Sequence, residues 1–352
     1  MSGDPVGHAE LVIDLGAFRA NVAHLASIAK PARTMLAVKA NAYGHGLLPL
    51  ARAALEAGAE SLAVLDVTTA LTLRKSGVDA PLFAWLHGVA TDFGGAVDAR
   101  IDLGISALWQ LDAIAAAGRT EPARVHLKVD TGLHRNGARP EDWPELVTGA
   151  LAAERAGLVH VAGLWSHLAD ASPADDSDAL ERFRQAVEIA RELGCRPEVL
   201  HLAASSAGIR EPEARFDIVR FGIAAYGISP FDDETAAQLG LRAVMTMRAP
   251  VREVSDELVI VAVGSADGVS TPAAGRASVA IAGRRHLVRS IGIDTITVER
   301  AGATIDIGDI VTVFGPGDDG EPSAEEWAEW AGTIGDEIVA HTTTRIARVY
   351  RE

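Results

Sequence analysis

Short runs of apolar residues recur between residues 34 and 223, and longer stretches with helical periodicity separate them. Most of the runs are almost continuously apolar, which is typical of strands buried on both faces in a parallel sheet. One intervening stretch, 178–193, carries apolar residues at helical spacings, and the residue after it is Gly194, a common helix stop. The predicted strands are 34–39, 61–65, 81–85, 100–104, 124–129, 158–164, 198–202 and 217–223.

These eight strands, with helical stretches between them and a further helix at 15–30, predict a closed (β/α)8 barrel. An open, doubly wound sheet is the alternative. No Gly-X-Gly-X-X-Gly segment follows a predicted strand, which weakens the dinucleotide-binding version of that alternative. The barrel is therefore the preferred fold.

The pattern changes after about residue 241. Apolar runs such as 258–263, 277–282 and 309–314 come at short intervals, separated by Gly, Pro and Asp, which predicts a β-rich region. We therefore predict two domains, a TIM-type α/β barrel over 10–235 and a β-rich C-terminal domain over 236–352, with a hinge at 231–234. The early run at 10–15 is compatible with either domain, and packing of residues 1–14 with the second domain is the alternative assignment.

Composition narrows the class of protein. The chain has 352 residues, 48% of them apolar, which excludes disorder, and a net charge of −16, which argues against nucleic-acid binding. The longest stretch without Asp, Glu, Lys or Arg is 156–169, shorter than the roughly 20 residues of a membrane helix. The start lacks the pattern of a secretory signal, and the single cysteine, Cys195, makes no internal disulfide. We expect a cytoplasmic protein whose acidic clusters at 175–178 and 318–319 are solvated loops.

Polar residues occur where the predicted barrel strands end. Active sites of such barrels lie at the carboxyl ends of the strands, so residues far apart in the sequence are expected to share one rim. Lys39, at the end of the first strand, is either an ordinary surface lysine or a buried one. Burial would lower its pKa and let the neutral amine form an imine with an aldehyde. His167 follows the sixth predicted strand and His201 and Ser205 the seventh, and Arg220 and Gly222 lie within the end of the last one.

The segment around Lys39 has a specific composition. Residues 36–46, Leu-Ala-Val-Lys-Ala-Asn-Ala-Tyr-Gly-His-Gly, resemble the pyridoxal-phosphate lysine segment of bacterial alanine racemases. Further segments resemble later motifs of that family in the same order, and the resemblance covers essentially the whole chain. These segments are 126–135, 165–167, 201–205, 220–227, 308–309 and 345–350.

The resemblance implies a chemistry for the barrel residues. Lys39 would hold pyridoxal 5'-phosphate as a Schiff base and act as the base on one face of the substrate α-carbon. Arg220 would face the pyridine nitrogen, with His167 hydrogen-bonded to it. Because arginine keeps its proton, that nitrogen would stay unprotonated and the cofactor would be a weaker electron sink. Arg135 would reach the cofactor phenolate or the substrate carboxylate, and Lys128, expected nearby, is often carbamylated in this family.

The resemblance also implies how phosphate and substrate are held. Tyr43, Ser205 and the backbone amides of Gly222 and Ile223 would bind the phosphate, a task suited to hydroxyl and exposed N–H groups. The backbone amide of Ile293 would contact an amino-acid substrate, and no metal is expected. The family forms head-to-tail homodimers in which each second domain completes its neighbour's site, and we expect the same of this chain.

The sequence departs from the family in the part of the site that the partner would supply. Residues 264–268 read Gly-Ser-Ala-Asp-Gly, with Ser265 where the family has the tyrosine that acts as second base. A serine hydroxyl is shorter than tyrosine's and less acidic than its pKa of ~10. Asp336 stands where another tyrosine would contact the phosphate, which a carboxylate would repel. Other replacements are Ala204 for asparagine, Phe221 for proline and Ile293 for methionine.

The sequence therefore predicts a pyridoxal-phosphate-dependent isomerase, an amino-acid racemase that interconverts L- and D-alanine. Asp267, Asp294 or a bound water are the candidates for the missing second base. The alternative is a divergent homologue that performs a different α-carbon reaction with Lys39 alone, or that has no catalysis. Arg220 argues against decarboxylation, which needs a stronger electron sink.

Overall fold

The structure is a computed structural model that describes residues 8–170 and 172–352. The chain forms two compact units. One contains the described residues up to Asn21, together with Ala40–Ala53 and Ile223–Glu352, and the other contains Val22–Lys39 and Ala54–Gly222. The predicted domain boundary between residues 235 and 236 stays a prediction, and its part concerning residues 1–7 lies outside the described residues. Among the helices that the structure describes, none has the length and apolarity needed to cross a membrane.

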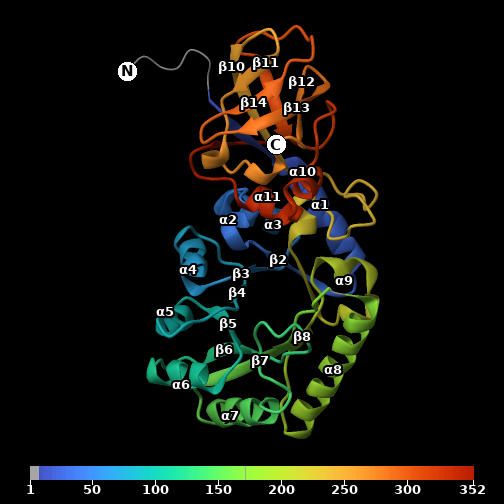
Figure 1. Cartoon of the computed structure of the whole chain (residues 1–352). Coiled ribbons are helices and arrows are strands. Elements are labelled where there is room, and N and C mark those ends of the chain that lie inside the picture. The colour runs from blue at the N-terminus through green and yellow to red at the C-terminus, as the bar shows by residue number, and fades with distance from the viewer. Residues whose placement is uncertain (1–7, 171) are drawn as a thin grey trace. The chain divides into compact units, whose positions relative to one another are not determined.

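Eight parallel strands form the first sheet, in the order β8-β7-β6-β5-β4-β3-β2-β9 (Figure 1). The ring closes between β8 and β9, where the Asp217 amide donates to Leu200 O at 3.0 Å and the Arg220 amide to Ala203 O at 3.1 Å. The predicted barrel is therefore confirmed. Its strands are β2 (Arg33–Ala37), β3 (Ser61–Val64), β4 (Leu82–Ala84), β5 (Ile101–Ile105), β6 (Ala123–Lys128), β7 (Val159–Trp165), β8 (Val199–His201) and β9 (Ile218–Phe221).

Apolar side chains fill the barrel because its strands are buried on both sides. A cluster inside the ring joins opposite strands, with Phe83 and Trp165 at its centre in an edge-to-face contact of 5.2 Å. The other members of this cluster are Met35, Ala37, Ala63, Val199 and Ile218, with Trp85 packed against them. The continuously apolar pattern of the sequence thus reflects burial on both faces.

Helices follow most of the barrel strands, and α4 to α8 lie outside the ring in Figure 1. The helix predicted at 178–193 starts earlier than expected, because Ser172 caps it and Pro173 occupies its first turn. Asp175 and Asp176 therefore lie in that first turn, where the helix dipole favours them, so the predicted loop at 175–178 is wrong. The helices are α1 (Leu15–Ala29), α2 (Lys39–Tyr43), α3 (Leu47–Glu56), α4 (Val67–Lys75), α5 (Phe93–Asp98), α6 (Leu108–Ala116), α7 (Trp143–Arg155), α8 (Pro173–Glu192) and α9 (Ser205–Arg210), with short 3-10 turns η1 (Pro212–Ala214) and η2 (Ile223–Tyr226).

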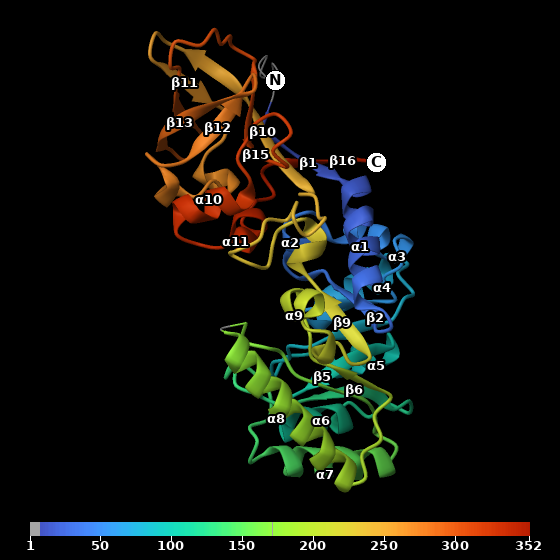
Figure 2. The same ribbon diagram turned by 90° about the vertical axis from the view of Figure 1, so that its right-hand side faces the viewer.

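The second sheet is mainly antiparallel, in the order β11-β14-β13-β12-β15-β10-β1-β16 (Figure 2). An additional pairing of β11 with β10 closes six of these strands into a small barrel, which confirms the predicted β-rich C-terminal domain. The early strand β1 (Glu10–Asp14) pairs with β10 and, in parallel, with the last strand. The remaining strands are β10 (Met245–Val254), β11 (Leu258–Val261), β12 (Ser278–Ile281), β13 (Arg284–Ile291), β14 (Ile296–Glu299), β15 (Ile310–Phe314) and β16 (Ala347–Arg351).

Two helices and two short 3-10 turns accompany the described strands in the C-terminal part of the chain. The helix α10 (Ala324–Ala331) begins at a capping box formed by Ser323 and Glu326, and ends at Gly332 in the left-handed conformation. Trp327 anchors it, because the indole is buried and donates to Val313 O at 2.7 Å. The other elements are α11 (Gly335–Ala340), η3 (Ser265–Asp267) and η4 (Thr271–Ala273).

Candidate active site

The residues directly after Lys39 form a left-handed turn. Ala40, Asn41, Ala42 and Tyr43 have φ angles of 51°, 55°, 54° and 50°. Each costs an L-residue about 1–2 kcal/mol, so a run of four persists only where the surroundings hold it, as at functional sites. The strand predicted at 34–39 accordingly ends at Ala37, and Lys39 begins α2.

Several hydrogen bonds hold this turn. The carbonyl of Asn41 accepts from the Gly46 amide at 2.9 Å, and its side-chain oxygen accepts from Leu47 N at 2.8 Å. The Arg348 guanidinium donates to Gly44 O at 2.6 Å. Gly44 has no room for a side chain, because a Cβ there would lie 2.1 Å from Val339 O. The strain beside Lys39 is thus held by specific contacts.

Tyr43, predicted to contact the phosphate, lies at the end of this turn and is buried. Its ring packs on Tyr226 with a centroid distance of 4.8 Å. Burial raises the pKa of Tyr43 above its usual range, and the nearby Asp336 carboxylate raises it further, so the phenol is neutral and able to donate. Asp336, which stands where the family has a tyrosine, therefore lies close enough to Tyr43 to act on it electrostatically.

Arg220 is the most connected polar residue of the barrel interior. It is 7% exposed, and burial lowers its pKa to about 9, so the guanidinium stays charged near neutral pH. Nη1 donates to His201 Nδ1 at 3.0 Å. Nη2 donates to Ser166 O at 2.8 Å, Leu202 O at 2.9 Å and His167 Nδ1 at 3.2 Å. Within the described part of the chain its Nε–H has no acceptor, so this N–H is available to a ligand.

Positive charge gathers around His167, which follows β7 at the carboxyl rim. Its pKa is lowered well below the usual range, first by burial and then by the charges of Arg220, Lys128, Arg135 and Lys39. His167 is therefore a neutral imidazole that accepts the hydrogen bond from Arg220. Four basic side chains so close together create a site suited to an anion.

Lys128, the last residue of β6, is 4% exposed, and its Nζ lies 4.5 Å from the centre of the Trp165 ring. Burial lowers its pKa to about 7, and the charges of Arg220 and Arg135 contribute to that shift. The expectation that Lys128 and Arg135 lie near each other thus agrees with the electrostatics. A substantial neutral fraction of this amine is present at physiological pH.

The predicted phosphate-binding residues lie where β8 and β9 end. Ser205 begins α9 and is buried, and its Oγ accepts from the Gly222 amide at 3.0 Å. This amide, predicted to bind phosphate, thus already has a protein acceptor, while the Ser205 hydroxyl hydrogen remains available to donate. Ile223 begins η2 and is buried, whereas Arg135 lies exposed in the loop after β6.

Ser265 and Ile293 lie side by side in the β-rich unit. The Ser265 amide donates to Gly292 O at 2.9 Å, and the Ala266 amide to Ile293 O at 3.0 Å. Ile293 is 69% exposed, whereas Asp267 is buried and accepts from the Gly264 amide at 2.9 Å. Arg345 pairs with Asp267 at 3.4 Å and with Asp294 at 2.6 Å. The two candidate carboxylates are thus joined by one cation.

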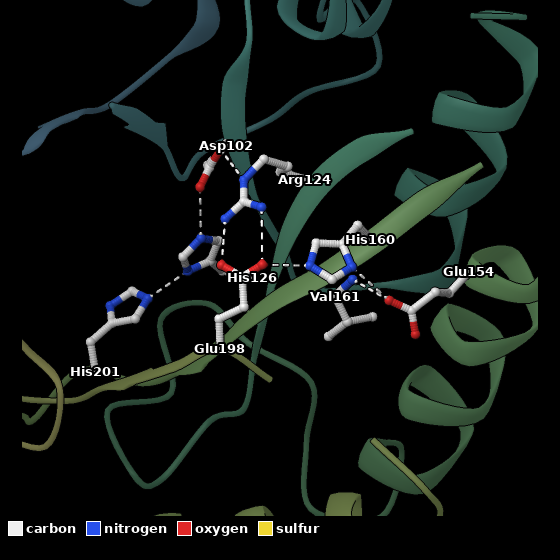
Figure 3. A network of polar contacts seen from close by, with 8 residues as sticks. All are labelled: Asp102, Arg124, His126, Glu154, His160, Val161, Glu198 and His201. Atoms are coloured by element: carbon white, nitrogen blue, oxygen red, sulfur yellow. Dashed lines mark hydrogen bonds and ion pairs between the residues drawn. The ribbon is translucent and has the colours of Figure 1, made fainter. Parts of the chain in front are cut away.

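Sequence reasoning missed two residues of the barrel interior, His126 on β6 and Asp102 on β5. His126 is 3% exposed, and it links His201 to Asp102 through hydrogen bonds of 2.9 and 3.1 Å (Figure 3). The available sign was a polar residue inside a predicted barrel strand. Across residues 8–170 and 172–352, no three His, Cys, Asp or Glu side chains gather in a way that would hold a metal ion.

The fold and this rim together define a class of protein, a (β/α)8 barrel with a cationic rim joined to a separate β domain. A family model described as alanine racemase, N-terminal domain, matches residues 13–230, and one described as alanine racemase, C-terminal domain, matches residues 247–350. The chain therefore belongs to the alanine racemase family.

Individual relatives agree over nearly their whole length. An alanine racemase of Thermobifida fusca is 42% identical over 367 residues, covering 97% of this chain and 98% of that protein. The crystal structure of an alanine racemase from Streptomyces lavendulae superposes with a TM-score of 0.94 at 39% identity, covering 98% of this chain and 97% of the other. The solved structure of an alanine racemase from Streptomyces coelicolor gives a TM-score of 0.93 at 42% identity, covering 97% of this chain and 98% of the other.

Proposed function

We propose that this protein is a pyridoxal-phosphate-dependent racemase that interconverts L- and D-alanine. The observation that carries the proposal is the position of Lys39 at the carboxyl rim, within electrostatic reach of His167 and beside the cations that surround it. The similarity to alanine racemases over 97–98% of the chain supports this reaction over the alternative, a different α-carbon reaction or no catalysis.

The barrel residues fit pyridoxal phosphate. Arg220 has an Nε–H without an acceptor among the described residues, and the pyridine nitrogen of the cofactor accepts one hydrogen bond. Lys39 would carry the cofactor covalently, while Tyr43, Ser205, Gly222 and Ile223 would bind its phosphate and Arg135 its phenolate or the substrate carboxylate. When bound, pyridoxal phosphate supplies an electron sink that acidifies the α-hydrogen of an attached amino acid.

Racemisation needs a proton removed on one face of the α-carbon and returned on the other. Lys39 would serve one face through its Nζ. The other face would be served from the segment of Ser265 in a partner subunit, with the Ile293 amide contacting the substrate. Asp294 is the stronger candidate for the proton-transfer group there, because its side chain is 63% exposed whereas that of Asp267 is 10% exposed.

The proposed reaction also bears on the oligomeric state and the cellular location of the protein. We propose a head-to-tail homodimer, since the predicted second proton-transfer group would come from a neighbouring copy. A net charge of −16 and a single buried thiol, Cys195, support a cytoplasmic enzyme without nucleic-acid or membrane partners. Light scattering at micromolar concentration tests the dimer, and a monomer would contradict it.

Chemical trapping tests the cofactor assignment. Reduction of the loaded protein with borohydride should leave a pyridoxyl group on the peptide that contains Lys39, detected by mass spectrometry. Lys39→Ala should abolish this adduct, whereas the control Lys75→Ala, which changes a lysine of helix α4, should retain it. An adduct on another lysine, or on none, would refute the role of Lys39.

Hydrogen exchange tests the reaction itself. The enzyme should exchange the α-hydrogen of both L- and D-alanine with deuterated solvent and invert their configuration. Exchange with retention would mean that one base works alone, and the absence of exchange would favour a protein without catalysis. Asp294→Asn should slow inversion more than Asp267→Asn does, and Ser265→Tyr should raise the rate of inversion.

A further inference from the structure

A continuous chain of polar side chains runs through the barrel from Arg220 to Asp102. Figure 3 shows its part from His201 to Asp102. Arg220 Nη1 lies 3.0 Å from His201 Nδ1. His201 Nε2 lies 2.9 Å from His126 Nδ1, and His126 Nε2 lies 3.1 Å from an Asp102 carboxylate oxygen. The two imidazoles are 0% and 3% exposed, and the Asp102 side chain is 20% exposed.

The chemistry of the two ends fixes the direction of every hydrogen bond. A guanidinium only donates, so His201 Nδ1 must accept and its hydrogen must reside on Nε2. His201 Nε2–H then donates to His126 Nδ1, which places the hydrogen of His126 on Nε2. This last N–H points at Asp102, and a carboxylate only accepts. The donors and acceptors therefore match throughout, from the cation to the anion.

Reversing the tautomers creates a conflict. With its hydrogen on Nδ1, His201 would direct an N–H at the N–H of Arg220 across 3.0 Å. Burial, aided by the Arg220 charge, lowers the pKa of His201 well below its usual range, so the ring is neutral. A doubly protonated ring, with a hydrogen on both nitrogens, therefore does not resolve the conflict. One arrangement of the two neutral rings is therefore compatible with a charged Arg220.

The barrel is built to hold these rings. In the register of the sheet, His126 lies between Gly104 of β5 and Gly163 of β7. A Cβ at Gly163 would lie 2.4 Å from His126 Nδ1, so a larger residue would displace the imidazole. His201 stacks on Trp165 with an interplanar angle of 7°, and Phe83 contacts both imidazoles at 4.9 and 5.4 Å.

The far end of the chain is also fixed. Arg124 Nε donates to the second carboxylate oxygen of Asp102 at 3.2 Å. The same guanidinium binds Glu198 through two hydrogen bonds, of 2.9 and 3.2 Å (Figure 3). Arg124 thus joins the Asp102 and Glu198 carboxylates.

We propose that Asp102 and His126 are positioning residues for Arg220, because together they hold His201 in the tautomer whose Nδ1 accepts from the guanidinium. Asp102 lies at the amino end of β5, whereas Arg220 lies near the carboxyl end of β9, so a residue at one end of the barrel orients a site residue at the other. Only the consequence for the reaction rests on the proposed function, in which Arg220 faces the cofactor nitrogen.

Histidine NMR of the full-length chain without cofactor tests the arrangement directly. Two-bond nitrogen–proton spectra of protein labelled with 15N-histidine, assigned with His126 and His201 variants, should show both rings as Nε2–H tautomers. In Asp102→Ala, His126 should populate the Nδ1–H form and the protected Nε2 proton of His201 should exchange faster. Asp102→Asn retains an oxygen acceptor and should preserve the original tautomers.

Kinetics of the loaded enzyme test the consequence. Asp102→Ala should lower kcat about tenfold with little change in KM, an effect of the size seen when a group that orients a reacting residue is removed. The control Arg124→Leu removes the ion pair but leaves the carboxylate facing His126, so tautomers and kcat should change little. Both variants alter side chains that are partly exposed, so the fold should tolerate them.

The outcomes separate this inference from the proposed function. An Nδ1–H tautomer at His201 in the unmodified protein would overturn the inference, as would an Asp102→Ala variant with unchanged tautomers and unchanged kcat. A chain that binds no pyridoxal phosphate yet shows the Nε2–H tautomers, lost in Asp102→Ala, would support the polar chain and refute the cofactor assignment.

Discussion

The surroundings of Lys128 predict how strongly the stability of the protein depends on pH. Its ammonium is 4% exposed, stands over Trp165 and is repelled by Arg220 and Arg135, and its pKa falls from 10.5 to about 7. An unfolded chain leaves this lysine in water with its ordinary pKa. Between pH 7 and 10.5 the unfolded state therefore binds more protons than the folded state, and stability rises with pH across that interval.

Lys128→Met removes the titrating group while keeping a flexible apolar side chain. One pKa unit corresponds to about 1.4 kcal/mol, so the buried ammonium costs the native state about 5 kcal/mol below pH 7. The cost falls to about 2 kcal/mol at pH 9, where the folded lysine is neutral and the unfolded one is still charged. Relative to the variant, the unmodified protein should thus gain about 3 kcal/mol between pH 6 and pH 9.

Urea unfolding of both proteins at several pH values measures this difference, because other titrating groups contribute equally to both. Buffers free of carbon dioxide are needed, since a neutral buried amine is the form that reacts to a carbamate. Lys30→Met, which removes an exposed lysine, sets the baseline. A difference between the unmodified protein and Lys128→Met that stays constant from pH 6 to pH 9 would refute the reasoning.

Two further changes have matched measurements. Gly227→Ala should lower the free energy of unfolding by about 3–4 kcal/mol, because φ at this glycine is +76° and the new Cβ would lie 1.8 Å from Arg242 O. The control Gly275→Ala has a similar φ of +77° but nothing within 4 Å of the new Cβ, and it should cost about 1 kcal/mol. Equal losses in urea unfolding would contradict the predicted clash. Glu198→Gln should lose up to about 1 kcal/mol at neutral pH, since hydrogen bonds from Arg124 hold the pKa of this half-exposed carboxyl at about 2. That difference should shrink as the pH falls from 4.5 toward 2, where the native carboxylate takes up its proton, and a loss that persists in acid would show another cause.

The fold was largely predictable because burial leaves a direct trace in the sequence. Strands covered on both sides are apolar at most positions, so eight nearly continuous apolar runs predicted the eight barrel strands. The position of a cap was less visible. Acidic residues such as Asp175 and Asp176 are typical of loops, yet helix α8 starts before them, with Ser172 as its N-cap and Pro173 in its first turn.

The candidate site was predictable where strand ends carry unusual residues, such as Lys39 and Arg220. The left-handed turn over Ala40–Tyr43 was not, because alanine and tyrosine have no preference for positive φ and only contacts such as Arg348 with Gly44 hold them there. The roles of His126 and Asp102 were not predictable for a related reason. A polar residue in a buried strand indicates a partner, but the partner lies on another strand at an unknown register.

Arg220 shows why the interior of this barrel contains neutral histidines. A buried guanidinium needs acceptors, and carbonyl oxygens of Ser166 and Leu202 satisfy one nitrogen. The other faces His201, and a carboxylate in that place would neutralise the charge of Arg220. A neutral imidazole accepts without adding charge, provided that its second nitrogen has an acceptor of its own, which His126 supplies. The anion that ends this series, Asp102, is thus kept at the far end of the barrel, and Arg220 keeps both its proton and its orientation toward the rim.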